Sequence, residues 1–226
     1  MAADEPQPLV VLVERNPWLM IIGSDSPTLA FYADGLVIFR KPDSADYLSV
    51  RLDETKRRDL VTQIAPEAIA GLRESYSASA WSDQPTNELH VWATGEHKTV
   101  SVYGALRREP TARAKTPESF LHAFDVITKF GPEASPWVPS QIEVLIWPYE
   151  HSPEEPLPWP DGWPNFEHAQ PRGADGLHQL FLPAKEFGRL KRLLEELKQK
   201  QAVQLDGRKW SVSYRMGLPR EDAWAR

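Results

Sequence analysis

The sequence contains short runs in which large apolar residues alternate with polar ones, a period of two that predicts β-strands. The clearest case is TLAFYADGLVIFR at residues 28–40, where Asp34-Gly35 divides two β-rich runs at a dipeptide that favours a tight hairpin turn. A second hairpin is predicted around Gly95. The other strands that the pattern predicts lie at residues 9–13, 18–22, 47–52, 88–93, 98–103, 142–147 and 178–182, with a last hairpin across Asp206-Gly207.

Helical spacing replaces this alternation in three segments. Asp53 is placed to cap a helix with one apolar face, and Pro66 begins a short second piece. Thr116-Pro117-Glu118 has the form of a helix start, with a hydroxyl cap, a first-turn proline and an acid, and predicts a helix over 116–130. Apolar side chains also recur every three or four positions over 183–197, which predicts an amphipathic helix there.

The second half of the chain repeats the order strand, helix, hairpin. Residues 47–61, YLSVRLDETKRRDLV, align without a gap with residues 177–191, LHQLFLPAKEFGRLK. An internal duplication and a chance similarity both explain this order. We predict one compact domain over residues 1–226, of class α+β, with mainly antiparallel sheet and three to four helices on one face. If the duplication is real, its halves are 9–110 and 140–219, joined by the helix at 116–130.

Composition narrows the class of protein. The 226 residues are 41% hydrophobic and 26% charged, which is the globular range, and a net charge of −6 argues against binding of nucleic-acid phosphates. The absence of cysteine excludes disulfides and thiolate chemistry. The N-terminal apolar run lacks a basic signal region and is broken by Glu14, Arg15 and Pro17 before it could span a bilayer. We therefore expect a cytoplasmic protein without a membrane partner.

Residues 149–171, YEHSPEEPLPWPDGWPNFEHAQP, depart from both patterns, and we call them the acidic segment. They include five acidic residues, four aromatic residues and six prolines, with no Lys or Arg. The segment lies in a connection from Pro148 to Gly176 with no predicted secondary structure, and connections of this length are normally functional or disordered. We expect order, because leaving the rings in water would forgo roughly 1.5–3 kcal/mol each and because proline lowers the entropy lost on folding.

The acidic segment is predicted to bind another protein of basic character. Aromatic side chains are the usual anchors of protein interfaces, and carboxylates around them would attract a cationic partner. A cytoplasmic immunity protein that blocks a toxin is one type with this profile. Two alternatives stay open: a structural domain in which the segment closes over a sheet as a lid, and a hydrolase that uses histidines and carboxylates of the loop. The predicted partner-binding residues are Tyr149, Glu150, Glu154, Glu155, Trp159, Asp161, Trp163 and Phe166.

The stretch WSDQPTNELHVWATGEHKTVSVYG at residues 81–104, with the upstream FYADGLVIFR and the helix after YLSVRL, resembles a bacterial domain of unknown function found mostly in envelope-associated and secreted proteins. The likeness covers roughly residues 28–106 and implies a fold but no activity. The secretion or lipoprotein signal common in such proteins is not found here, which argues against an envelope location. Within the stretch, Asp83 is expected to accept backbone N–H bonds in a turn, and Pro85 to fix the entry to the next strand.

No motif specifies a reaction, and the sequence predicts neither an enzyme nor a cofactor. It contains no HExxH and no glycine-rich phosphate loop, and GSDSP at residues 23–27 is not a G-x-S-x-G elbow. We expect His90 and His97 on opposite faces of their hairpin, so that no metal site is predicted. His151, His168 and His178 lie in or beside the acidic segment, where one of them could pair with a carboxylate as a general base.

Overall fold

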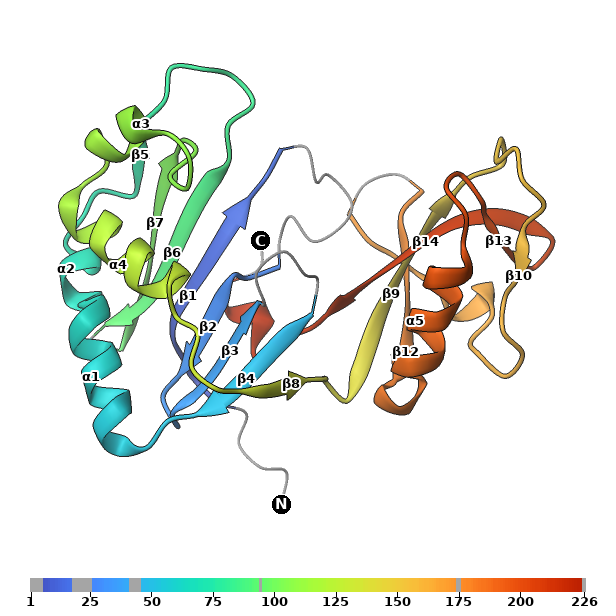
Figure 1. Ribbon diagram of the computed structural model, residues 1–226, viewed down its shortest axis with the longest axis horizontal. Coiled ribbons are helices and arrows are strands. Elements are labelled where there is room, and N and C mark those ends of the chain that lie inside the picture. Colours follow the sequence, from blue (N-terminus) through green and yellow to red (C-terminus); the bar gives the residue numbers. More distant parts are fainter. Residues whose placement is uncertain (1–5, 18–25, 41–45, 94, 174–175, 225–226) are drawn as a thin grey trace. The chain divides into compact units, whose positions relative to one another are not determined.

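The computed structural model of the protein describes residues 6–17, 26–40, 46–93, 95–173 and 176–224 (Figure 1). The chain forms two compact units: unit 1 comprises Met1–Trp137 with Leu218–Arg226, and unit 2 comprises Val138–Gly217. Each unit has an open, mostly antiparallel sheet and a hydrophobic core of its own. The predicted α+β class is confirmed, with two sheets. The strand predicted at 18–22 lies outside the described residues.

Unit 1 is built on an eight-stranded sheet in the order β5-β7-β6-β1-β2-β3-β4-β8, in which only β5 and β7 pair in parallel. The two predicted hairpins, β2-β3 and β6-β7, are both present. The edge strands β5 and β8 were not predicted, because three residues are too few to show an alternating pattern. The strands are β1 (Pro8–Arg15), β2 (Leu29–Tyr32), β3 (Leu36–Arg40), β4 (Tyr47–Arg51), β5 (Ser75–Ser77), β6 (Thr86–Ala93), β7 (Glu96–Tyr103) and β8 (Ser135–Trp137).

Helices α1 (Glu54–Ile64), α2 (Pro66–Ala70) and α4 (Glu118–Thr128) pack on one face of this sheet (Figure 1), and the short α3 (Pro110–Ala114) precedes α4. The Asp53 cap is confirmed, since its Oδ1 accepts the Lys56 N–H at 2.9 Å. Helix α4 inserts Phe120, Phe124 and Ile127 into the core between helices and sheet. It therefore belongs to the core of unit 1 instead of standing between two halves.

The start of α4 differs from the prediction. Thr116 does not cap this helix, because its hydroxyl donates to the carbonyl of Ala112 at 2.9 Å. Pro117 occupies the N-cap position, without a side-chain cap. The physical reason is that α3 ends one turn earlier, so that its free carbonyls compete for the hydroxyl, a competition that the isolated helix-start pattern does not reveal.

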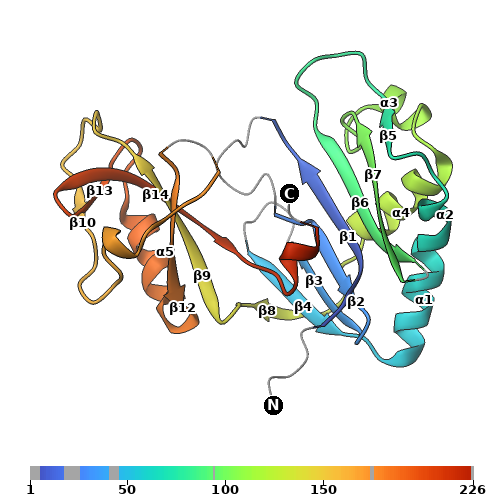
Figure 2. The same cartoon turned by 180° about the vertical axis from the view of Figure 1, so that it is seen from behind.

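The opposite face of the unit 1 sheet is also buried in the central strands β1, β2 and β3. It carries Val11, Val13, Ala30 and Ile38, none of which is exposed. The C-terminal stretch with the 3-10 turn η3 (Glu221–Ala223) lies beside β2 and β3 (Figure 2). Its contacts with the sheet include a hydrogen bond of 3.0 Å from the Tyr32 hydroxyl to the Pro219 carbonyl and an edge-to-face contact of 6.2 Å between the rings of Trp92 and Trp224.

Unit 2 has a six-stranded sheet in the order β10-β13-β14-β9-β12-β11, covered by helix α5 (Phe187–Glu196). The hairpin across Asp206-Gly207 is confirmed, and both turn residues have positive φ, as a two-residue hairpin turn requires. The helix predicted from Pro183 begins as a 3-10 turn, η2 (Ala184–Glu186). The strands are β9 (Gln141–Pro148), β10 (Leu157–Pro158), β11 (Gln170–Pro171), β12 (His178–Pro183), β13 (Val203–Leu205) and β14 (Arg208–Met216).

Both units contain the order strand, helix, hairpin, but they arrange it differently. In unit 1 the first hairpin strand, β6, pairs with the rest of the sheet through β1. In unit 2 it is the second hairpin strand, β14, that pairs with β9. The strand before the helix also differs, because β4 lies four places from β6 whereas β12 lies two places from β14. The similarity in sequence order does not extend to the strand order of the sheets.

Candidate functional site

The acidic segment is folded against unit 2. Contrary to the expectation of a segment without secondary structure, it contains the short strands β10 and β11 and a 3-10 turn, η1 (Phe166–His168). The N–H groups of Leu157 and Trp159 donate to Ala202 and Gln204 at 2.9 Å each, which adds β10 to the sheet edge. The segment therefore uses the edge of β13 as a template.

The aromatic rings of the segment belong to the core of unit 2. Trp163 is only 8% exposed, and its Nε1 donates to Glu186 at 2.8 Å. Trp159 is half-buried, packs edge to face on Trp163 at 5.1 Å and donates to the Pro164 carbonyl. Phe166, also half-buried, stacks on Trp210 at 4.8 Å. The indole N–H groups are thus satisfied within the unit, and the rings hold the segment in place.

The carboxylates of the segment face solvent. Glu154, Glu155 and Asp161 are exposed and form no ion pair among the described residues. Glu150 is exposed but pairs with Arg208 at 3.3 Å. Tyr149 is half-buried, and its backbone N–H donates to Lys209. Of the predicted partner-binding residues, the acids therefore line the surface while the tryptophans and Phe166 lie mainly within the fold.

The histidines of this region do not form a base with a carboxylate partner in the contacts that the structure shows. His168 Nδ1 lies 2.6 Å from the Asn165 amide oxygen, and His178 Nδ1 lies 3.1 Å from the Gly176 carbonyl. Both rings thus face neutral oxygens, and His151 is exposed. This arrangement offers no general base oriented by an acid.

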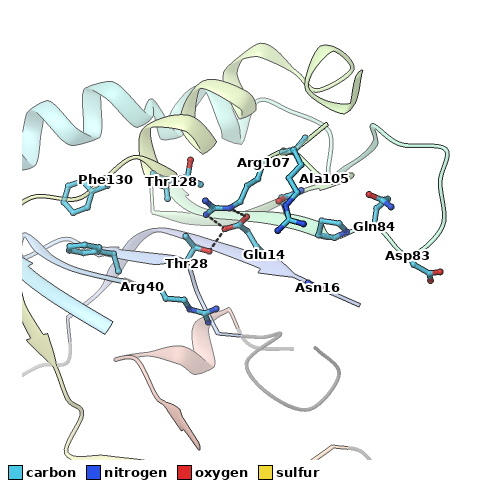
Figure 3. A pocket seen from close by; sticks show the side chains of 16 residues that line it. Glu14, Asn16, Thr28, Arg40, Asp83, Gln84, Ala105, Arg107, Thr128 and Phe130 are labelled. Carbon is cyan, nitrogen blue, oxygen red and sulfur yellow. Dashed lines mark hydrogen bonds and ion pairs between the residues drawn. The ribbon is translucent and has the colours of Figure 1, made fainter. Parts of the chain in front are cut away.

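A cleft of about 570 Å³ opens in unit 1, within the size range of ligand pockets (Figure 3). Residues from β1, β3, the loop before β6 and the stretch after β7 converge on it. Its apolar end is formed by Phe39 and Phe130, whose rings meet edge to face at 5.2 Å. Among the described residues that line the cleft there is no His, Cys or Ser, and its polar lining includes Glu14, Asp83 and three arginines.

Glu14 organises the middle of the cleft. Its two carboxylate oxygens accept the Nε and Nη2 groups of Arg107 at 2.7 Å each, and one of them also accepts the Thr28 hydroxyl at 2.6 Å (Figure 3). This two-point pairing joins β1 to the stretch after β7. The charges of Glu14 and Arg107 therefore compensate each other and fix the cleft wall.

The remaining charges leave the cleft with an excess of cations. Arg40 donates through Nη2 to the Ser26 carbonyl at 3.1 Å, while its buried Nε has no hydrogen-bond partner among the described residues. Arg108 is exposed and forms no ion pair within the described part of the chain. Apart from the Glu14–Arg107 pair, the charged groups that line the cleft are therefore these two guanidinium groups and the carboxylate of Asp83. The cleft is therefore suited to an anionic group.

Trp81, which the sequence analysis did not select, lies on the loop that borders this cleft. Its side chain is 72% exposed. The backbone of the loop is held at both ends of the stretch, because the Tyr103 hydroxyl donates to the Trp81 carbonyl at 2.9 Å and accepts the Gln84 N–H at 3.1 Å. Asp83 has φ of 58°, so the turn is left-handed at this residue. The result is an exposed indole on a fixed backbone.

The expectation that His90 and His97 lie on opposite faces is wrong. His90 pairs in register with Thr99 and Trp92 pairs with His97, so that both imidazoles stand on one face of the β6-β7 hairpin. His90 Nδ1 lies 3.3 Å from His97 Nε2. The expectation treated the seven-residue spacing as if both histidines lay on one strand. Because the turn reverses the chain between them, the cross-strand register of β6 and β7 decides which side chains share a face.

Among the described residues, no group of three or more His, Cys, Asp or Glu side chains is arranged to hold a metal ion, and no helix is long and apolar enough to cross a membrane. No family model, curated protein or solved structure matches the chain. The function must therefore be argued from the geometry of the units.

Proposed function

We propose that the protein is a non-enzymatic binding protein, and that its unit 1 recognises a peptide stretch of another protein that is rich in Asp or Glu. The observation that carries this proposal is the exposure of Trp81, 72% on a loop that lines the cationic cleft. Trp is among the residues most enriched at the energetic centres of protein interfaces. An apolar ring of this size in water is a feature that binding would use and folding does not.

The fixed loop supports this proposal. The hydrogen bonds of Tyr103 to Trp81 and Gln84, together with the Ser79 hydroxyl that accepts the Trp81 N–H at 3.2 Å, hold the backbone before any partner arrives. A preorganised anchor loses less conformational entropy on binding than a mobile one. The Trp81 ring can therefore contribute to affinity without an ordering step of its loop.

The charge of the cleft supports an acidic partner. Arg40 and Arg108 are not matched by carboxylates in the contacts shown, whereas the Arg107 charge is already met by Glu14. Guanidinium groups favour carboxylates, which they can bind through two parallel hydrogen bonds. The expected ligand is a peptide segment that combines an apolar side chain for Trp81 with Asp or Glu for the cleft.

The test is selection of a random peptide library on the immobilised full chain, followed by affinity measurement on variants. We expect enrichment of acidic peptides, and a loss of at least about 30-fold in affinity for Trp81→Ala, the size of effect typical of an interface hot spot. Arg108→Glu should weaken the same peptides. Phe181→Ala removes a 38% exposed ring in unit 2 and is the matched control, which should bind as the wild type does. Failure to enrich peptides, or equal binding by Trp81→Ala, would contradict the proposal.

A second candidate is the binding of a basic protein by the acidic segment, as an immunity protein would bind a toxin. It is supported by the exposed carboxylates of Glu154, Glu155 and Asp161, which form no ion pair with any described residue and lie on a segment that its tryptophans hold in place. The same library distinguishes the two candidates. The second candidate predicts enrichment of peptides rich in Lys and Arg. These peptides should lose affinity for the triple variant Glu154→Gln, Glu155→Gln, Asp161→Asn and keep their affinity for Trp81→Ala. That result would favour the acidic segment as the binding surface.

A further inference from the structure

Three donor atoms meet on the face of the β6-β7 hairpin away from the helices. His90 Nδ1 lies 3.3 Å from His97 Nε2, and the Thr99 hydroxyl oxygen lies 3.1 Å from the first and 3.4 Å from the second. Two atoms that ligate one ion at about 2.0–2.1 Å with tetrahedral angles are separated by about 3.3 Å. The three atoms therefore already have the spacing of one face of a metal tetrahedron.

Glu88 is placed to orient His90. The buried His90 ring, 1% exposed, has its Nε2 at 3.6 Å from Glu88 Oε2, and Nε2 has no hydrogen-bond partner among the described residues. Glu88 is itself held in place by an ion pair of 2.8 Å with Arg15 Nε. A carboxylate beside Nε2 favours the tautomer with its proton there, which leaves a lone pair on Nδ1.

His97 lies on the solvent-exposed side of the site. Its ring is exposed and stacks on Trp92, with centroids 4.5 Å apart and planes 14° from parallel. A cleft of about 530 Å³, lined in part by His97, Thr99, Glu88 and Ser101, opens beside it. Water can therefore reach the side of the site that the protein leaves open, while Trp92 limits the rotation of the imidazole.

We propose that His90, His97 and Thr99 form a binding site for one first-row transition-metal ion, with the two imidazoles as the principal ligands. The Thr99 hydroxyl is a weaker third ligand, and water completes the coordination from the open cleft. Imidazole nitrogen selects Zn²⁺, Ni²⁺ or Cu²⁺ over Mg²⁺ and Ca²⁺, which prefer oxygen ligands. Glu88 acts through the far side of His90 as a positioning residue. This site is separate from the Trp81 cleft, so neither proposal depends on the other.

The experiment titrates the full chain with Zn²⁺ and records calorimetry together with the ring ¹H–¹⁵N signals of the six histidines. We expect one ion per chain, with shifts confined to His90 Nδ1 and His97 Nε2. His97→Ala, at an exposed position, should fold and lose at least about tenfold in affinity. Glu88→Gln should lose about 10- to 100-fold, the range typical of residues behind metal-bound histidines.

The matched control is His122→Ala, which removes an exposed imidazole from α4 and should leave Zn²⁺ binding unchanged. Mg²⁺ at the same concentration should shift neither ring. Two NMR results would overturn the proposal: Zn²⁺ shifts that fall on His122, His151, His168 or His178 instead, or an imidazole-to-imidazole hydrogen bond between His90 and His97 that persists at saturating Zn²⁺. Equal affinity in His97→Ala would have the same meaning.

Discussion

Two tryptophans show how differently single residues of one type are used in this chain. Trp163 is 8% exposed and donates to Glu186, whereas Trp81 is 72% exposed while its own backbone is bonded on both sides. The first ring contributes to the core of unit 2, and the second contributes nothing to the core of unit 1 in the contacts shown. Burial, and not residue type, therefore separates a structural ring from a candidate anchor.

Among charged residues, Asp125 provides a pH-dependent contribution to stability. The hydrogen bond from Arg113, 2.7 Å long, lowers the pKa of Asp125 below its ordinary value. A carboxyl group whose pKa is lower in the folded than in the unfolded state stabilises the fold fully at pH values above its ordinary pKa of ~3.9. This contribution to stability is lost as the pH falls through the lowered pKa of the folded state. Because the pair is partly exposed, Asp125→Asn should reduce the free energy of unfolding by at most about 1 kcal/mol at pH 7.

Urea unfolding at about pH 7 and about pH 3 checks this prediction. The difference in free energy of unfolding between the wild type and Asp125→Asn should be smaller at the acidic pH. Asp59→Asn, at an exposed position on α1, is the control and should show no such narrowing. A difference that stays constant between the two pH values would show that the variant acts through packing and not through charge.

At the scale of elements, the hairpin turns of unit 1 depend on glycine for two separable reasons. Gly35 and Gly95 have nearly the same φ, 84° and 85°, a conformation that disfavours any residue with a Cβ. A Cβ at Gly35 would also lie 2.6 Å from the Leu52 carbonyl oxygen, whereas a Cβ at Gly95 would meet nothing within 4 Å. The first turn therefore combines a backbone requirement with a contact that the second lacks.

We predict that Gly95→Ala lowers the free energy of unfolding by roughly 1–2 kcal/mol, the cost of left-handed backbone for an L-residue. Gly35→Ala should lower the free energy of unfolding by more than this, because the Leu52 carbonyl must also move. That movement would strain the hydrogen bond of 2.9 Å that the Leu52 N–H donates to the Gly35 carbonyl. Chemical denaturation of the two variants gives the comparison directly. Equal losses would mean that the turn relaxes away from Leu52 at no cost.

At the scale of the whole molecule, unit 1 is completed by a stretch that is distant in sequence. The chain leaves unit 1 after Trp137 and returns to it at Leu218. Leu218 and Trp224, 5% and 3% exposed, are both buried, and the Pro219 carbonyl accepts the Tyr32 hydroxyl. The last residues therefore cover part of the sheet face opposite the helices.

We predict that a chain ending at Gly217 loses amide protection in β1, β2 and β6, because the truncation uncovers Tyr32 and Trp92. Protection of β9 and β14 in unit 2 should be retained, since the core of that unit contains no residue of the deleted stretch. Hydrogen exchange followed by mass spectrometry resolves these strands. A chain ending at Trp224 keeps both contacts and is the control; unchanged protection of β1 in the shorter chain would contradict the prediction.

The elements of this protein could largely be predicted from local sequence. Asp34-Gly35 and Asp206-Gly207 each carry the turn geometry within two residues, and the Asp53 cap acts over three. Short-range signals fail where two elements compete, as at Thr116, whose hydroxyl bonds the preceding helix. Alternation and helical spacing thus determined which residues form strands and helices, because those patterns reflect the side-chain geometry of the element itself.

Only the tertiary structure decided what these elements do together. The strand order of the two sheets, the cross-strand approach of His90 and His97, and the gathering of Arg40, Arg107 and Arg108 around one cleft all join residues distant along the chain. The acidic segment shows the same limit, since its composition indicated order and charge but not that Trp163 would pack into the core. Burial and register depend on which faces meet in space, and no period within a single segment encodes that meeting.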